Sequence, residues 1–176
     1  MNQISITLPD GTIKDCRVGV TGNEIAESIG SGLLRASIAI KVDGELRDLQ
    51  YEILNDSAVE ILTNRNEESH HILLHSTAHL LAQAIKEIFP NAKIAIGPAL
   101  KETFYYDIDV DEVINEDVLS AIEDKMKEIA KRSYRVSRVD MDYDEAINLF
   151  KKMKEDYKVE IIEEIESDDK ISAYRQ

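Results

Sequence analysis

The stretch "ISITLPDGTIKDCRVGVTGNEIAESIG", residues 4–30, contains the signals that decide the fold of the first part of the chain. Its first apolar residues alternate with polar ones, which is the period of a half-buried β-strand: Ile4, Ile6 and Leu8. The "PDG" at 9–11 predicts a turn, and a second strand is expected from about Thr12 to Val18. These signals together predict a β-hairpin.

A short helix is expected after the hairpin. Thr21 and Glu24 have the spacing of a capping box, and Gly30 is a typical helix stop. Apolar alternation returns at 38–42, and "AVEIL" at 58–62 predicts a final strand. A hairpin, one short helix and further strands on a mixed sheet is the order of the ubiquitin-like β-grasp fold.

The chain is predicted to hold two domains. "TNRNEES" at 63–69 contains no apolar residue, so it is the expected linker between a first domain at 1–62 and a second at 70–176. The apolar period becomes helical over 70–89, and a proline follows directly.

The second domain is expected to mix helices and strands. Strands are predicted at 93–100 and 103–110, where apolar and aromatic residues alternate with polar ones, and again at 134–140. Helices are predicted to begin at the capping residues Asn115 and Asp142. The fold class is therefore α+β, with a β-grasp domain first.

The composition is that of a globular protein, with 43% hydrophobic and 32% charged residues. No apolar run approaches the roughly 18 residues of a membrane helix. The N-terminus lacks the basic start and apolar core of a signal peptide. Cys16 is the only cysteine, which argues against a disulfide framework and a thiolate metal site. A cytoplasmic protein without a membrane partner is expected.

The charge is strongly acidic. The chain has 35 acidic and 21 basic residues and a net charge of −14. Phosphate backbones favour basic surfaces, so this argues against nonspecific nucleic-acid binding by the chain as a whole. A local basic patch, or one supplied by another part of the protein, remains compatible with the sequence.

The stretch "LLHSTAHLLAQAI" at 73–85 places two histidines four positions apart on the predicted helix. Such residues point in directions about 40° apart, one turn along the helix. His75 and His79 therefore face the same way, as a two-histidine site requires. They lie beside the apolar stripe, in line with Lys86, so an active face and a partly exposed polar edge both remain open.

A metal site is not predicted at this pair. A zincin needs Glu at position 76, and Ser76 stands there. Two imidazoles alone leave zinc under-coordinated, and the spacing offers no third ligand. His70 and His71 either flank the helix start or extend the histidine row. A two-histidine metallohydrolase that holds zinc stays an alternative.

Lys158 stands among acidic and apolar residues in "DYKVEII" at 156–162. A solvated surface lysine is the ordinary interpretation of such a position. A cation held close to a site is the alternative.

These motifs together resemble the N-terminal region of the threonyl-tRNA synthetase family. Residues 1–62 resemble its TGS domain, which has the β-grasp fold, and "HSTAHLLAQAIKEIFPNAKIAIGPALKETFYYDIDV" at 75–110 resembles the opening of its editing domain. "SYRVSRVDMDYDEAINLF" at 133–150 and "DYKVEII" at 156–162 continue the match in order. Alanyl-tRNA synthetases share the two-histidine helix, but its combination with a TGS domain is specific.

The resemblance implies a function and a set of site residues. The family attaches threonine to its tRNA with ATP and hydrolyses mischarged seryl-tRNA(Thr) at an editing site. His75 would position or activate the attacking water, His79 would help build the pocket, and Lys158 would supply a cation near the ester and the terminal ribose. Gly97 and Tyr106 would line the pocket, with Gly97 helping to exclude threonine. The family's editing site is expected to work without metal.

The resemblance also implies that the editing domain at 70–176 is incomplete. In the family a stretch like "ISAYRQ" leads to a Cys-x-x-x-His motif that completes the pocket, and the chain stops before it. ATP, magnesium and zinc are implied for a catalytic domain further on, and a homodimer through that domain. The partner is the threonine tRNA, with its 3′ end at the editing site. The chain alone is expected to be inactive.

A non-catalytic alternative is a TGS-containing protein that binds RNA or another partner. A class II synthetase domain encoded downstream would favour the first interpretation, and a stop after Gln176 the second.

Overall fold

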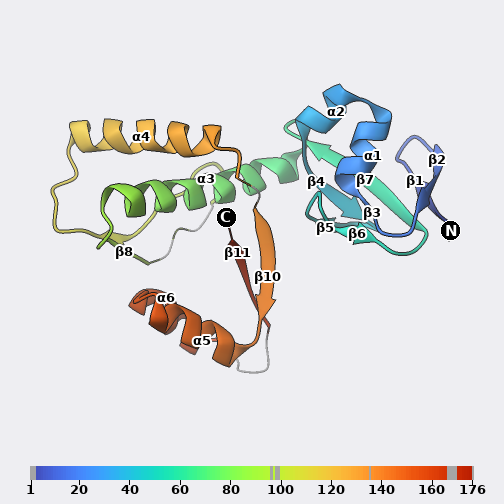
Figure 1. Ribbon diagram of the computed structural model, residues 1–176. Helices are drawn as coiled ribbons and strands as arrows, with labels where there is room; N and C mark the ends of the chain where they lie inside the picture. Colours follow the sequence, from blue (N-terminus) through green and yellow to red (C-terminus); the bar gives the residue numbers. More distant parts are fainter. Residues whose placement is uncertain (1–2, 96, 98–99, 135, 166–169, 176) are drawn as a thin grey trace. The chain divides into compact units, whose positions relative to one another are not determined.

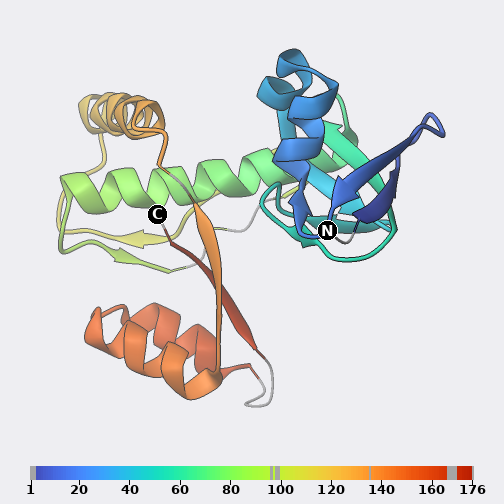
Figure 2. The ribbon, with the colours of Figure 1, turned by 45° about the vertical axis from the view of Figure 1, so that its right-hand side comes forward.

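The computed structural model describes the chain in five ranges: residues 3–95, 97, 100–134, 136–165 and 170–175. The chain divides into two compact units, Met1–Leu73 and Leu74–Gln176. Figures 1 and 2 show that both units contain helices and strands, which confirms the predicted α+β class.

The first unit is built on a five-stranded sheet in the order β2-β1-β7-β4-β5. Its elements in chain order are β1 (Gln3–Thr7), β2 (Ile13–Arg17), β3 (Val20–Thr21), α1 (Gly22–Ile29), α2 (Ser31–Ala36), β4 (Ser37–Val42), β5 (Glu45–Arg47), β6 (Glu52–Ile53) and β7 (Ser57–Thr63). Strand β1 pairs antiparallel with β2 and parallel with β7, while β4 pairs antiparallel with β7 and β5. The predicted β-grasp fold is confirmed.

The capping box predicts the start of α1 correctly. The Glu24 N–H donates to Thr21 Oγ1 at 3.4 Å, and the Thr21 N–H donates to Glu24 Oε2 at 2.9 Å. The helix ends at Gly30, as expected, but the chain enters α2 directly, a helix that the sequence did not predict. The core beneath α1 consists of buried aliphatic residues: Ile4, Ile6, Val20, Ile25, Ile40, Ile53 and Val59.

Helix α3 (Glu67–Ile88) begins inside the stretch predicted as a linker, and the second unit starts within this helix, at Leu74. Its further elements are β8 (Lys93–Ile94), β9 (Ile108–Asp109), α4 (Glu116–Lys131), β10 (Ser137–Met141), α5 (Tyr143–Lys152), α6 (Asp156–Glu163) and β11 (Ile171–Arg175). Strand β8 pairs antiparallel with β9, and β10 pairs antiparallel with β11.

Two apolar clusters hold this unit together. The first packs α4 and the short β8–β9 ladder on different sides of α3 (Figures 1 and 2): Ala84, Ile85, Ala92, Ile94, Ile122 and Ile129. The second joins α5, α6 and β11 through Ala146, Ile162 and Ile171. Helix α6 also contacts β8, and Glu155 at its start forms an ion pair with Lys86 of α3.

The second unit contains the predicted helices, but it differs from the prediction in the length of one ladder and in two additional elements. Asn115 and Asp142 cap α4 and α5 as expected, through side chains that accept from the N–H groups of Val118 and Glu145. Of the ladder predicted over 93–100 and 103–110, the described residues pair over two residues in each strand, and residues 96, 98 and 99 lie outside the described part. The sequence did not predict α6 or β11.

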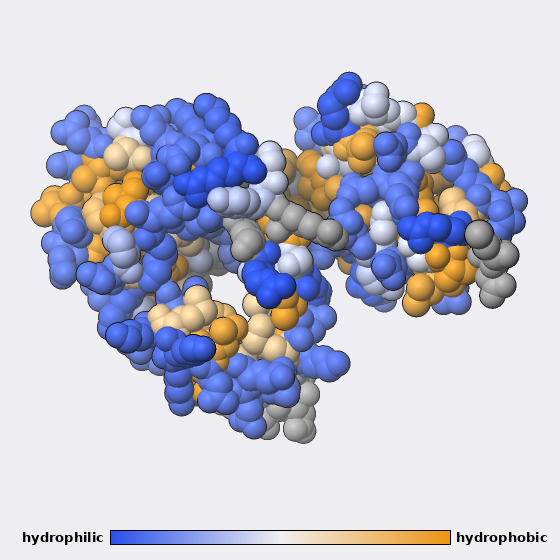
Figure 3. All heavy atoms as spheres, in the orientation of Figure 1, coloured by the Kyte–Doolittle hydropathy of each residue, from blue (hydrophilic) through white to orange (hydrophobic). Residues whose placement is uncertain are grey.

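Hydrophilic side chains cover much of the visible face of each unit, with apolar patches between them (Figure 3). Within the described ranges, no helix is both long enough and apolar enough to cross a membrane.

Gly22 and Gly32 offer a matched test of packing in the first unit. A Cβ on Gly22 would lie 2.6 Å from Ile40 Cγ2, in the core, whereas a Cβ on Gly32 meets nothing within 4 Å. We expect Gly22→Ala to destabilise by about 1–3 kcal/mol through overpacking. Gly32→Ala, in helix α2, should stabilise by about 0.5–1 kcal/mol. Urea unfolding of both variants measures the difference, and equal effects would contradict this packing.

Candidate functional site

Helix α3 brings the two histidines into direct contact. His75 Nε2 and His79 Nε2 lie 2.9 Å apart, and the two rings meet edge to face with centroids 4.6 Å apart. One Nε2 must therefore donate a hydrogen bond and the other must accept it. In neutral imidazoles the donor ring then has a bare Nδ1 and the acceptor ring has a protonated Nδ1. The pair thus offers one proton acceptor and one donor.

The surroundings of His79 favour its neutral form. Although both rings keep solvent exposure, partial burial of His79 lowers its pKa below the ordinary value of 6.5, and the positive charges of His75 and Lys158 lower it further. The Tyr174 ring of β11 lies 6.4 Å from the His79 ring, centroid to centroid. A neutral imidazole near pH 7 can accept a proton, which is the requirement for a general base.

Lys158 belongs to the first turn of α6. Its Nζ lies 5.5 Å from the centroid of the Phe150 ring and 3.9 Å from Glu155 Oε2. After burial and His75, its charge is the third cause of the lowered pKa of His79. Of the predicted site residues, the structure thus brings His75 and His79 into direct contact, and Lys158 is related to them by this electrostatic effect.

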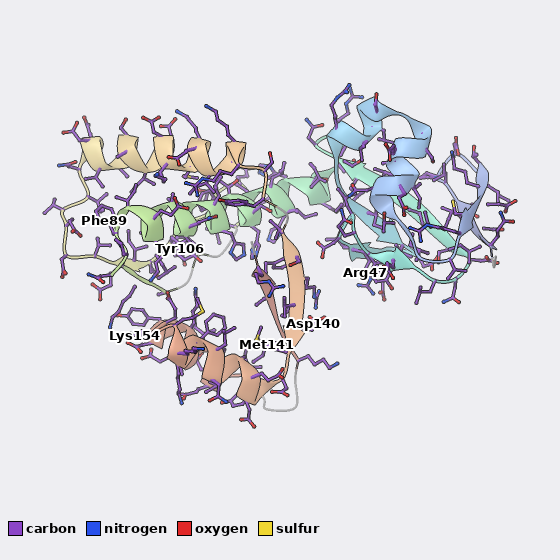
Figure 4. All side chains as sticks on the ribbon, in the orientation of Figure 1. Arg47, Phe89, Tyr106, Asp140, Met141 and Lys154 are labelled. Carbon is purple, nitrogen blue, oxygen red and sulfur yellow. The ribbon has the colours of Figure 1, made fainter. Side chains whose placement is uncertain are left out.

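The other two predicted residues contact each other. A Cβ on Gly97 would overlap the Tyr106 ring at Cδ2, Cε2 and Cζ, so the absence of a side chain at Gly97 lets the ring lie against the backbone. Figure 4 labels Tyr106 among the side chains of the second unit. Burial, followed by the charge of Glu155, raises the pKa of Tyr106 above its ordinary value. Its hydroxyl therefore remains a hydrogen-bond donor at neutral pH.

Glu155 is a residue that the sequence analysis missed. Its side chain is 5% exposed and forms an ion pair with Lys86, on α3, at 2.8 Å, while its charge acts on both Lys158 and Tyr106. The only sequence signal was its position three residues before Lys158. Burial of a carboxylate is a property of the folded chain, and the acidic neighbours of Glu155 gave no reason to single it out.

The described residues contain no group of three or more His, Cys, Asp or Glu side chains that could hold a metal ion. The Nε2 atoms of His75 and His79 are directed at each other and are engaged in their mutual hydrogen bond. This arrangement does not favour the metallohydrolase alternative, because zinc sites use three or four protein ligands.

Comparison with known proteins finds a matching domain family and relatives along the whole chain. Residues 4–63 match the TGS domain. The whole chain is 47% identical to the threonine–tRNA ligase of Geobacter sp. (strain M21), and 42% identical to that of Oceanobacillus iheyensis. The threonine–tRNA ligase of Desulforamulus reducens is 44% identical over 98% of the chain. The chain spans about 28% of the length of the first of these relatives and 27% of the other two. The resemblance found in the sequence is confirmed.

The lowered pKa of His79 has a consequence for stability. The folded protein binds a proton at His79 less readily than the unfolded chain, so its contribution is fully present above pH 6.5 and is lost as the pH falls through the folded pKa. Unfolding free energies should therefore drop more between about pH 7.5 and about pH 5.5 in the wild type than in His79→Gln. Urea unfolding at both pH values measures this, and equal slopes would contradict the desolvated environment.

Proposed function

We propose that this chain, which is similar over its whole length to the N-terminal part of threonine–tRNA ligases, contributes to hydrolytic editing of seryl-tRNA(Thr) in such an enzyme. The observation that supports the proposal most directly is the His75–His79 contact at 2.9 Å, and the charge of Lys158 contributes to the lowered pKa of His79. The parent enzyme would attach threonine to its tRNA with ATP.

The need for editing follows from the substrates. Serine lacks one methyl group of threonine, and a binding pocket discriminates one such group by only about 1–3 kcal/mol. A threonine-specific site therefore admits some serine. A second site that hydrolyses the seryl ester and rejects the larger threonyl ester removes the error.

The hydrolysis needs a base, a water and a stabilising charge. His75 positions the water and accepts its proton as the water oxygen bonds to the ester carbonyl carbon. The tetrahedral intermediate carries negative charge on the former carbonyl oxygen, and the Lys158 ammonium stabilises this charge and the adjacent ribose. The bond from carbon to the ribose oxygen then breaks, the ribose oxygen takes up a proton, and serine leaves. His79 supports His75 through the Nε2 contact.

Gly97 and Tyr106 provide the selectivity in this proposal. The Tyr106 ring lies against Gly97, at a position that a side chain on residue 97 would displace, and the two residues would form one wall of the pocket. A fixed wall close to the amino acid leaves no room for the extra methyl group of threonine. An overpacking cost of about 1–3 kcal/mol against threonine at this second site would multiply the discrimination at the first site.

The proposal includes partners and cofactors beyond this chain. The threonine tRNA would place its 3′ end at the histidines, and ATP, magnesium and zinc would bind in the parts of the enzyme that the chain does not span. These parts would form the homodimer and contribute most of the phosphate contacts, since the chain has a net charge of −14. Such an enzyme would act in the cytoplasm, because it supplies charged tRNA for translation there.

A chimaera tests the proposal. This chain is to replace the homologous region of the Geobacter sp. ligase, with which it is 47% identical, and deacylation of seryl-tRNA(Thr) is to be measured. We expect the chimaera to hydrolyse the ester, and His75→Ala to reduce the rate by about 10²–10⁴-fold through loss of general base catalysis.

His71→Ala is the matched control, because His71 is an exposed histidine on the same helix, one turn before His75. It should retain the parental rate. Deacylation at the parental rate in His75→Ala would remove that histidine from the mechanism. A chimaera without deacylase activity would favour the non-catalytic binding alternative.

A further inference from the structure

The turn between α5 and α6 has a specific backbone geometry. Lys154, labelled in Figure 4, has a left-handed backbone with φ +59°. Its N–H donates to the Lys151 carbonyl at 3.1 Å, and the Glu155 N–H donates to the Phe150 carbonyl at 3.0 Å. These two bonds define a Schellman motif at the end of α5. The motif fixes the backbones of Phe150 and Glu155 to each other.

Glu155 places a charge inside the unit. In the part of the chain that the structure describes, it is the one charged residue that is buried, with 5% exposed. Its Oε1 lies 2.8 Å from Lys86 Nζ, and its Oε2 lies 3.9 Å from Lys158 Nζ. Lys86 also donates to the Ala92 carbonyl at 2.8 Å. A buried carboxylate is costly without such partners, so its place between two lysines needs an explanation.

The two residues joined by the Schellman motif are the same two that hold Lys158. The Phe150 ring faces the ammonium at 5.5 Å, within the range of a cation–π interaction, and Glu155 supplies its carboxylate. No other carboxylate of the described ranges forms an ion pair with Lys158. The end of α5 is therefore a support for one lysine of the following helix.

We propose that Glu155 is a positioning residue that holds the Lys158 ammonium beside the His75–His79 pair, with the Phe150 ring as a second support. The catalytic consequence rests on the proposed function, but the placement of the ammonium does not.

The charges of this cluster explain how Glu155 can hold Lys158 without cancelling its field. Glu155 shares its negative charge between Lys86 and Lys158, so the three side chains together remain positive. The shorter contact goes to Lys86, on the same helix as the histidines. Lys158 is thus tethered toward α3 and still has an excess positive charge to offer an anionic intermediate. Without the tether, the flexible lysine stem would reach into solvent.

The pKa of His79 reports where the Lys158 charge is. The charged groups that act on His79 are His75 from α3 and Lys158 from α6, and both lower its pKa. Titration of the histidine side chains by NMR, on the full 176-residue chain, measures this pKa. We expect Lys158→Met to raise it toward 6.5, and Glu155→Gln to raise it in the same direction because the ammonium moves away. The double variant should raise the pKa no further than Lys158→Met alone, since both changes remove the same effect.

The sign of the Glu155→Gln shift separates the proposal from a merely structural role. If the ammonium stayed in place without Glu155, the loss of a negative charge would leave two cations uncompensated, and the pKa of His79 would fall or stay constant. Either result overturns the proposal. Phe150→Leu keeps the apolar bulk and removes the aromatic face, so it should also raise the pKa. This variant carries the test if Glu155→Gln does not fold.

Deacylation by the chimaera is the second measurement that tests the positioning role of Glu155. Glu155→Gln and Lys158→Met should each slow hydrolysis of seryl-tRNA(Thr), by about 10²-fold for a displaced ammonium, and the losses should not multiply in the double variant. An active chimaera in which Glu155→Gln changes neither rate nor pKa contradicts the positioning role. An inactive chimaera in which the pKa shifts remain contradicts the proposed function and leaves the positioning role standing.

Discussion

A carboxylate buried in a protein is costly unless it is paired, and in this chain Glu155 is paired with two lysines. Lys158 lies three residues further along α6, the helix that Glu155 caps, whereas Lys86 comes from α3, so separating the two helices would break the Lys86–Glu155 ion pair. The histidines depend on the same arrangement. The period of α3 places His75, His79 and Lys86 along one side, while Ala84 and Ile85 are buried on another. The Lys86–Glu155 ion pair therefore links the helix that carries the histidines to the start of α6.

The two units use different means to reach a defined structure. In the first, Ile6, Ile25 and Ile40 form one apolar core under a sheet, and Gly22 allows α1 to approach that core closely. In the second, two smaller clusters are supplemented by ion pairs and short ladders. The polar connections lie where the candidate site is, as expected for a site that needs charged groups held in place.

Local signals in the sequence predicted most of the first unit and the helix starts of the second. The capping residues Thr21, Asn115 and Asp142 act on backbone groups three positions away, so a single sequence reveals them. Helix α6 was not predictable in this way, because its N-cap residue Glu155 makes no capping hydrogen bond through its side chain. Strand β11 was not predictable either, because it is defined by pairing with β10. The histidine pair was visible from its spacing, whereas the burial of Glu155 exists only once α5, α6 and α3 are packed.

In terms of folding, the support for Lys158 and its alignment with the histidines are separate events. Phe150, Glu155 and Lys158 are close in sequence, so their contacts close a short loop and need little of the chain to be ordered. Contact between Lys86 and Glu155 joins distant segments and carries a larger entropy of loop closure. The position of Lys158 within its own segment is thus set by local contacts, whereas the position of α6 against the rest of the unit depends on long-range ion pairs such as Lys86–Glu155 and Lys93–Asp156.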